Sequence, residues 1–230
     1  MNEQIKNIIK QVVGVFENSS TEIIYDSVVN LGDNRGYTCC SYGWTTVDGD
    51  ALSVIAKYNK ETMNKFAFVL HKLWMNNSPS TWRLKLMGFP SAWAKACLDK
   101  DFRDAQDAQY EITYITPAIE LAQKYGITSN LGYLIFIDTN TQHGFDGPDS
   151  LSDIAKRADQ HINDGSFLYT FLEVRRNVLL NPQDEGTKEE WSQSVGRVDC
   201  LKSLLDSKNF DLKTPFKINP WGDEEFTIDA

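Results

Sequence analysis

The chain has 230 residues, of which 41% are hydrophobic and 12% aromatic, so it can bury a substantial core and need not be disordered. Its formal net charge of −9 argues against nucleic acid and against an anionic membrane as partners, because both are bound mainly through Lys and Arg. No stretch is long and apolar enough to span a bilayer, and an acidic protein instead attracts cationic partners.

Apolar residues recur with helical spacing along most of the chain. The first such segment carries Ile5, Val12 and Phe16 on one face, interleaved with lysines, which is not the pattern of a signal peptide. The spacing predicts helices over about 3–17, 20–30, 50–58, 62–75, 91–109, 116–125, 129–142, 151–161, 166–180 and 188–206.

The boundaries of the second helix rest on local signals. The sequence Ser19-Ser20-Thr21-Glu22 has the capping-box pattern and predicts its start, and Gly32 predicts its end. Strand signal is confined to about 35–47, and the tail after Phe210 is predicted to be irregular. We therefore expect a mainly α (α+β) fold with one small sheet near the N-terminus.

Glu17 is the first candidate for chemistry. It is predicted to end an apolar helix directly after Phe16, where the helix dipole is negative. Both the dipole and apolar neighbours favour the protonated carboxyl, which is the state that a general acid requires. The alternative is a solvated glutamate at a frayed helix end.

Asp33 is predicted to lie in the opposite environment. It follows Gly32 in a polar turn, with Arg35 two residues further on, so backbone donors and a guanidinium favour its ionised form. Two carboxyls held in contrasting surroundings are the arrangement that glycosidic hydrolysis uses. The alternative is an ordinary loop with a capping aspartate.

These two segments, Glu-Asn-Ser-Ser from Glu17 and Gly-Asp-Asn-Arg-Gly-Tyr-Thr from Gly32, resemble those of the inverting chitosanases, glycoside hydrolase family 46. The resemblance implies that Glu17 is the general acid and Asp33 the general base, and that Thr38 helps to position the attacking water. It also implies a two-lobed, lysozyme-like fold with a substrate cleft between the lobes.

Further family motifs follow in order along the chain. Gly49-Asp50 resembles a pair whose aspartate binds a glucosamine amine, and the resemblance also makes Arg35, Tyr37 and Tyr114 substrate-binding residues. The closing motifs include Asn209-Phe210-Asp211-Leu212. The stretch 59–90 matches little of the family, and Cys39-Cys40 replaces a Gly-Gly pair, which would narrow the cleft floor or place a reactive thiol there.

A supporting ionic network is also expected. Asp138 interrupts the apolar run from Leu134 to Ile137, and Arg175 and Arg197 lie on otherwise core-facing helices, where charges must pair or become neutral. By resemblance the three residues form a network behind the active site, linked towards Glu17. A purely structural salt bridge is the alternative.

No cofactor or metal is expected. The three histidines lack the spacing of a zinc site, and Asp48-Gly49-Asp50 is too short for a calcium loop. The sequence also has no phosphate-binding glycine loop, nucleophile elbow or dinucleotide fingerprint.

The resemblance implies endo-hydrolysis of β-1,4-glucosaminidic bonds in chitosan by inverting single displacement. Residues 1–230 would form one catalytic domain of two lobes, one built mainly from about 30–110, acting as a monomer on a cationic polysaccharide. The resemblance implies an extracellular location, and a cytoplasmic one is the alternative because the first segment is not a signal peptide. One alternative is a lysozyme-like hydrolase of peptidoglycan or chitin, although peptidoglycan is anionic and the chain is acidic. Another is a non-catalytic carbohydrate-binding protein, although such a protein would be expected to lose Glu17 or Asp33.

Overall fold

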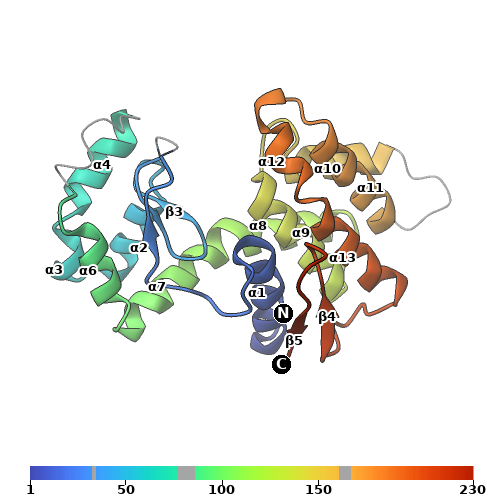
Figure 1. Cartoon of the computed structure of the whole chain (residues 1–230), viewed down its shortest axis with the longest axis horizontal. Helices are drawn as coiled ribbons and strands as arrows, with labels where there is room; N and C mark the ends of the chain where they lie inside the picture. The colour runs from blue at the N-terminus through green and yellow to red at the C-terminus, as the bar shows by residue number, and fades with distance from the viewer. Residues whose placement is uncertain (33–34, 77–85, 161–166, 230) are drawn as a thin grey trace. The chain divides into compact units, whose positions relative to one another are not determined.

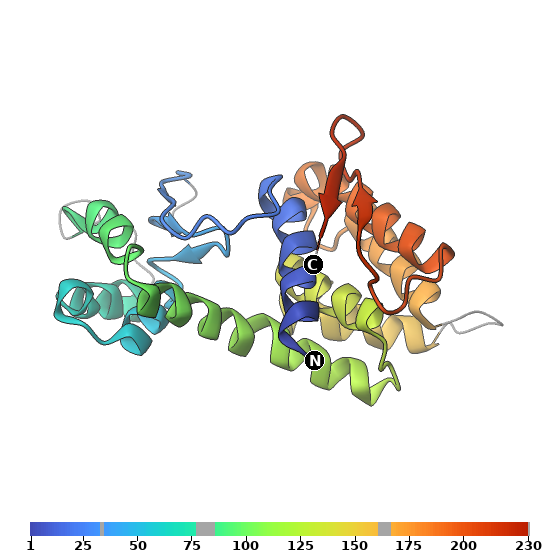
Figure 2. The same cartoon turned by 90° about the horizontal axis from the view of Figure 1, so that it is seen from below.

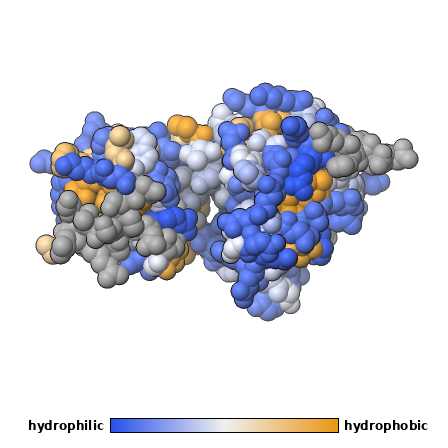
Figure 3. Space-filling view, turned by 90° about the horizontal axis from the view of Figure 1, so that it is seen from above, coloured by the Kyte–Doolittle hydropathy of each residue, from blue (hydrophilic) through white to orange (hydrophobic). Residues whose placement is uncertain are grey.

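The computed structural model describes residues 1–32, 35–76, 86–160 and 167–229 (Figure 1). The chain divides into two compact units. The first, unit 1, comprises residues 1–21 and 114–230, and the second, unit 2, comprises residues 22–113. Within the described ranges, no helix is long and apolar enough to cross a membrane. Hydrophilic residues predominate on the face shown in Figure 3, with smaller apolar patches among them.

Unit 1 is built around α9 (Asn130–His143). Nearly all side chains of this helix from Leu131 to Asn140 are buried, because neighbouring helices pack on several of its sides. α9 contacts α1 (Glu3–Asn18), α8 (Thr116–Lys124), α10 (Leu151–Gln160) and α13 (Val195–Asp206) (Figure 2).

The remaining elements of unit 1 pack around this centre. α11 (Phe167–Leu180) contacts α10, α13 and α12 (Lys188–Ser192), which follows the 3₁₀ turn η3 (Glu185–Thr187). The strands β4 (Phe216–Ile218) and β5 (Phe226–Ile228) form an antiparallel hairpin, and β5 contacts α1.

Unit 2 contains a three-stranded antiparallel sheet, ordered β1 (Val28–Val29), β2 (Thr38–Cys39) and β3 (Trp44–Thr45). Its helices are α2 (Asp50–Tyr58), α3 (Glu61–Asn64), α4 (Ala67–Asn76), α6 (Phe89–Ala96) and α7 (Lys100–Tyr110). A π-helical turn, η2 (Glu111–Ile115), joins α7 directly to α8, and the boundary between the two units falls within it.

Asp107 on α7 anchors the segments around the small sheet. Its carboxylate accepts hydrogen bonds from the hydroxyls of Tyr25, at 3.0 Å, and Tyr42, at 2.5 Å. The ring of Tyr42 also stacks on Tyr110 with centroids 4.3 Å apart. Bonds to a carboxylate are among the stronger hydrogen bonds, so this cluster fixes the sheet region to a rigid helix.

The structure confirms a mainly helical fold with a small sheet near the N-terminus. The helix predicted over 20–30 is wrong, because its backbone groups bond to residues distant in sequence. Ile24 N–H donates to Ser41 Oγ, and the carbonyl of Tyr25 accepts from Trp93 Nε1. The predicted capping box is wrong as well, since Ser19 instead ends α1 in the left-handed conformation (φ 51°).

Three other predicted helices are interrupted, and the tail is more regular than expected. The ranges 62–75, 91–109 and 188–206 each divide into two helices, and Asp99 marks one division by capping α7 through Asp101 N–H. The predicted irregular tail contains the β4–β5 hairpin. Its alternating apolar residues Phe216, Ile218, Phe226 and Ile228 were a period-two signal for these strands.

Candidate active site

The end of α1 positions Glu17. The helix buries Ile9, Val12 and Phe16 and ends at Asn18, so Glu17 lies at the edge of the buried face. The chain then turns back over the helix. A Cβ on Gly14 would lie 2.7 Å from the carbonyl oxygen of Ser20, so a side chain there would displace this turn.

Arg197 of α13 holds Glu17 from the protein interior. Its Nη2 lies 2.7 Å from Glu17 Oε1 and 2.6 Å from Asp138 Oδ1, so one nitrogen bridges two carboxylates. The guanidinium also lies over the ring of Phe16, 5.3 Å from its centroid. Two consecutive residues of α1 therefore contact the same cation.

Arg175 of α11 completes the network from the other side of Asp138. Its Nη1 lies 2.7 Å from Asp138 Oδ2, and its Nη2 donates to Gln142 Oε1 at 2.7 Å. The side chains of Arg175 and Asp138 are completely buried, whereas that of Glu17 is 33% exposed. The network thus joins a buried centre to one accessible carboxylate.

The ionisation of this network follows from the balance of burial and pairing. Burial alone would raise the pKa of Asp138, but Arg197 and Arg175 outweigh it and hold the pKa below its usual value. Burial alone would lower the pKa of Arg197, but Asp138 and Glu17 raise it. At Arg175, burial outweighs the pairing with Asp138, and the pKa is lowered.

His143 is the last residue of α9 and lies against Trp191, with ring centroids 4.7 Å apart. Burial, and then the positive charges of Arg175 and Arg197, lower the pKa of His143 to about 2. Burial therefore favours the neutral imidazole. Together with Asp138 and Gln142, it places three polar side chains in the last two turns of one helix.

Tyr114 lies in the π-helical turn between α7 and α8. Its carbonyl oxygen accepts a hydrogen bond of 2.9 Å from Asn140 Nδ2, two residues after Asp138 on α9. Single π-helical turns within α-helices are frequent at functional sites. Unit 1 thus brings together Glu17, Asp138, Arg175 and Arg197, and ties the backbone of Tyr114 to the same central helix.

Unit 2 brings together Thr38 and Asp50. Thr38 pairs with Thr45 across β2 and β3, and Thr45 N–H donates to Asp50 Oδ2 at 3.3 Å. Thr38 Oγ1 is buried and has no hydrogen-bond partner among the described residues. Burial raises the pKa of Asp50, and the Thr45 N–H offsets this only in part.

Other predicted site residues flank β2. Arg35 is exposed, and it contributes a positive charge near Asp50 that favours the ionised carboxylate. The ring of Tyr37 stacks on Phe89 with centroids 6.0 Å apart, and the backbone N–H of Tyr37 donates to Thr46 Oγ1. Asp33 lies outside the described residues.

The adjacent cysteines do not provide a reactive thiol. Both side chains are buried, and burial raises the pKa of the Cys39 and Cys40 thiols well above its usual value. A raised pKa keeps a thiol in the unreactive protonated form. Cys40 also has φ 62°, a conformation that favours glycine.

Sequence reasoning missed Gln142, and it considered the histidines only as possible zinc ligands. Gln142 follows Asp138 by four residues on a helix, so its presence on the same face was available from spacing. The electrostatic effect of the arginines on His143 depends on residues more than thirty positions away and left no local signal.

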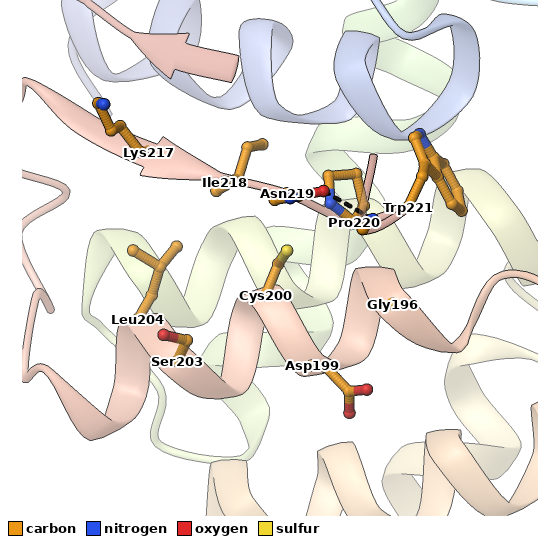
Figure 4. A pocket seen from close by; sticks show the side chains of 11 residues that line it. Gly196, Asp199, Cys200, Ser203, Leu204, Lys217, Ile218, Asn219, Pro220 and Trp221 are labelled. Atoms are coloured by element: carbon orange, nitrogen blue, oxygen red, sulfur yellow. Dashed lines mark hydrogen bonds between the residues drawn. The ribbon is translucent and has the colours of Figure 1, made fainter. Parts of the chain in front are cut away.

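A possible metal site and a cavity were the remaining features to locate. Within the described part of the chain, no group of three or more His, Cys, Asp or Glu side chains is arranged to hold a metal ion. A cavity of about 530 Å³ lies between α13 and residues 217–222 (Figure 4). It is lined by Cys200 and Trp221 but by none of the predicted catalytic residues, and the carboxylate of Asp199 points away from β4.

Comparison with known families places the chain. The family model described as glycosyl hydrolase family 46 matches residues 11–216. The chain belongs to this family. It is 37% identical to the chitosanase of Bacillus subtilis (strain 168), over 95% of this chain and 83% of that protein. It is 31% identical to the chitosanase of Nocardioides sp. (strain N106), over 95% of this chain and 80% of that protein.

Solved structures of the family have the same fold. A mutant chitosanase from Bacillus subtilis MY002, complexed with 6 GlcN, superimposes with a TM-score of 0.85 at 36% identity, over 100% of both chains. The Gynuella sunshinyii GH46 chitosanase, in complex with chitotetraose, gives a TM-score of 0.86 at 32% identity, over 100% of this chain and 99% of that one. This family 46 protein is accordingly a glycoside hydrolase.

Removing Arg197 should destabilise the hydrolase strongly. We expect Arg197→Ala to lower the free energy of unfolding by about 3–5 kcal/mol, because it leaves Asp138 buried with one cation fewer. The matched control is Arg176→Ala on α11, whose pair with Asp199 is exposed and should contribute less than about 1 kcal/mol. Urea denaturation of both variants measures the difference. Equal losses of unfolding free energy in the two variants would show that the buried pairing stabilises the fold no more than the exposed pair does.

His143 should make the fold sensitive to acid. Its pKa of about 2 in the folded chain lies below the 6.5 of a solvated histidine, so the unfolded chain takes up a proton that the folded chain does not. The stability is complete above pH 6.5 and falls as the pH decreases towards 2. Between pH 7.5 and 4.5 this one group costs about 2–3 kcal/mol.

The test compares His143→Gln with exposed His71→Gln. The His143 variant should lose less stability than the wild type between pH 7.5 and pH 4.5, as measured by urea denaturation at both pH values. The His71 variant should follow the wild type. An unchanged pH dependence in the His143 variant would contradict the assignment.

Proposed function

We propose that this hydrolase cuts the β-1,4-glucosaminidic bonds of chitosan within the chain, by inverting single displacement. The observation that carries the proposal is the partly exposed carboxylate of Glu17, which Arg197 joins to a buried ionic network. The named relatives are chitosanases, and their complexes with glucosamine oligomers support the choice of substrate.

In the proposed mechanism, Glu17 protonates the glycosidic oxygen of the leaving group. Its bond to Arg197 through Oε1 restricts the rotation of the carboxyl, which keeps the acid oriented at low entropic cost. Asp33 takes a proton from a water that attacks the opposite face of the sugar. Thr38 would help to position that water.

Selection for free amines rests on negative charge. Asp50 would pair with a protonated glucosamine amine, while Arg35, Tyr37 and Tyr114 would contact other parts of the polymer. The net charge of −9 favours the approach of a polycation. We propose that residues 1–230 act as one catalytic domain, monomeric, without a cofactor and in an extracellular location.

The same carboxylates would also suit chitin or peptidoglycan, so the substrate needs a direct comparison. Release of reducing ends should be fast from chitosan and at least about tenfold slower from chitin and peptidoglycan, since neither presents a row of free amines for Asp50. Equal or faster release from chitin or peptidoglycan would overturn the choice of polymer. No release from any of the three would favour a non-catalytic binding protein.

Glu17→Gln should lower kcat by several orders of magnitude while leaving the binding of glucosamine oligomers largely intact, because it removes the proton and little else. Asp33→Asn should have the same effect for the base. Glu3→Gln, an exposed change at the other end of α1, is the matched control and should leave both kcat and oligomer binding unchanged. A rate above about a tenth of wild type in either catalytic variant would refute that residue's role.

The stereochemistry of the first product tests the single displacement. Attack by water on the face opposite the leaving group inverts the anomeric carbon, so β-linked chitosan should give α-configured products. Proton NMR during the first minutes of the reaction, before mutarotation, distinguishes the two anomers. Initial products of β configuration would require a covalent intermediate and would rule out the mechanism proposed here.

A further inference from the structure

A half-exposed tryptophan lies beside the predicted amine-binding aspartate. Trp74 is on α4, which packs on α2, and it belongs to the stretch that matches little of the family motifs (Figure 1). The residue is 50% exposed. His71 contacts its ring nearly edge to face, with centroids 5.9 Å apart and planes at 75°.

The ring of Trp74 lies flat over Gly49. A Cβ built on this glycine would lie 3.1 Å from Cδ1, 3.2 Å from Nε1 and 3.3 Å from Cγ of the indole. Nearly equal distances to three adjacent ring atoms describe a point above the ring face, because a point beside the ring edge would be much closer to the central atom. One face therefore covers Gly49, and the exposed half of the side chain remains available to a ligand.

Only glycine permits this contact. Gly49 has φ 97°, which L side chains rarely adopt, and a side chain there would meet the indole within 3.3 Å. Gly49 is also the N-cap of α2, and Asp50 is the first residue of that helix. At the start of α2, the Trp74 ring therefore covers one residue and the next residue carries the carboxylate. The Cα atoms of these two residues, Gly49 and Asp50, are about 3.8 Å apart.

Two carboxylates flank the glycine that the ring covers, and Arg35 is a cation near Asp50. Asp48 is exposed and Asp50 is partly buried, so carboxylates stand on both sides of Gly49 in the sequence. Thr45 orients both, since its hydroxyl donates to Asp48 Oδ2 at 2.8 Å and its N–H donates to Asp50 Oδ2 at 3.3 Å. A ligand that matches this surface has an apolar face and an adjacent positive charge.

We propose that Trp74 forms the floor of a glucosamine subsite, in which a sugar ring stacks on the indole while its ammonium pairs with Asp50. The pyranose supplies the apolar face and the protonated amine supplies the charge. A cation beside an aromatic face is itself favourable. This inference rests on the proposed chitosan substrate and adds a specificity-determining residue for it.

The test measures KM and kcat for a fully deacetylated glucosamine hexamer. Trp74→Ala should raise KM about three- to tenfold, as loss of one aromatic contact does, and leave kcat within about twofold. Trp74→Phe should recover most of the affinity, because it keeps an aromatic face. Phe68→Ala is the matched control, because Phe68 is a 68% exposed aromatic residue on the same helix. Its ring contacts the Lys72 ammonium and not Gly49.

Coupling to Asp50 gives a second readout. If Trp74 and Asp50 bind the same sugar, the double variant Trp74→Ala/Asp50→Asn should raise KM by less than the product of the two single fold-changes. Thermal unfolding of each variant separates binding from stability. A loss of affinity that follows the loss of stability, and that Trp74→Phe does not restore, would show a structural role and overturn the inference.

The outcomes separate the two proposals. An active wild type whose KM is unchanged in Trp74→Ala would overturn the subsite and leave the proposed function standing. A wild type that does not hydrolyse chitosan would overturn the proposed function, and the subsite with it. A raised KM that the phenylalanine variant restores, with Phe68→Ala unchanged, is the result that we expect.

Discussion

The fully buried carboxylate of Asp138 is the constraint on which unit 1 depends. A lone charge in this interior would be prohibitively unfavourable, so α11 and α13 must each supply a guanidinium to α9. Arg197 then extends the pairing to Glu17 and contacts Phe16 beside it. The requirement to neutralise one aspartate therefore fixes the relative positions of α1, α9, α11 and α13, and the same contacts orient the proposed acid. Stability and the proposed acid catalysis therefore depend on the same atoms.

Elements that bury their own apolar stripe were predictable from the sequence. The helices near 3–17, 50–58, 116–125 and 129–142 follow from local spacing, and the structure has them within one or two residues. The segment 20–30 failed because its polar backbone groups find partners from Ser41 and Trp93. Those partners are distant in sequence, and their hydrogen bonds compete successfully with those of a helix. Local propensity carries no information about such competition.

The site shows the same division. Glu17, Asp138, Arg175 and Arg197 were predictable because charges in apolar runs are conspicuous and the family motifs mark them. Trp74 was not, since nothing in its own segment shows that an indole covers Gly49, 25 positions earlier. The glycine itself was noticed only as part of a family motif. Its physical role, a positive φ under an aromatic ring, becomes visible only when the two helices are packed together.

The electrostatics of Asp50 give the proposed amine subsite a working range of pH. Burial raises the pKa of Asp50, so acid neutralises this carboxyl earlier than an ordinary aspartate. An amine, in contrast, carries its charge in acid and loses it as the pH rises. The pair is ionised on both sides only between these two titrations. The lower limit is set by the protein, through the depth at which Asp50 is buried, and Arg35 and the Thr45 N–H keep that limit from rising further. The upper limit is set by the substrate. Trp74 adds a contact that does not titrate, so its contribution to binding should persist at both limits, where the ion pair fails.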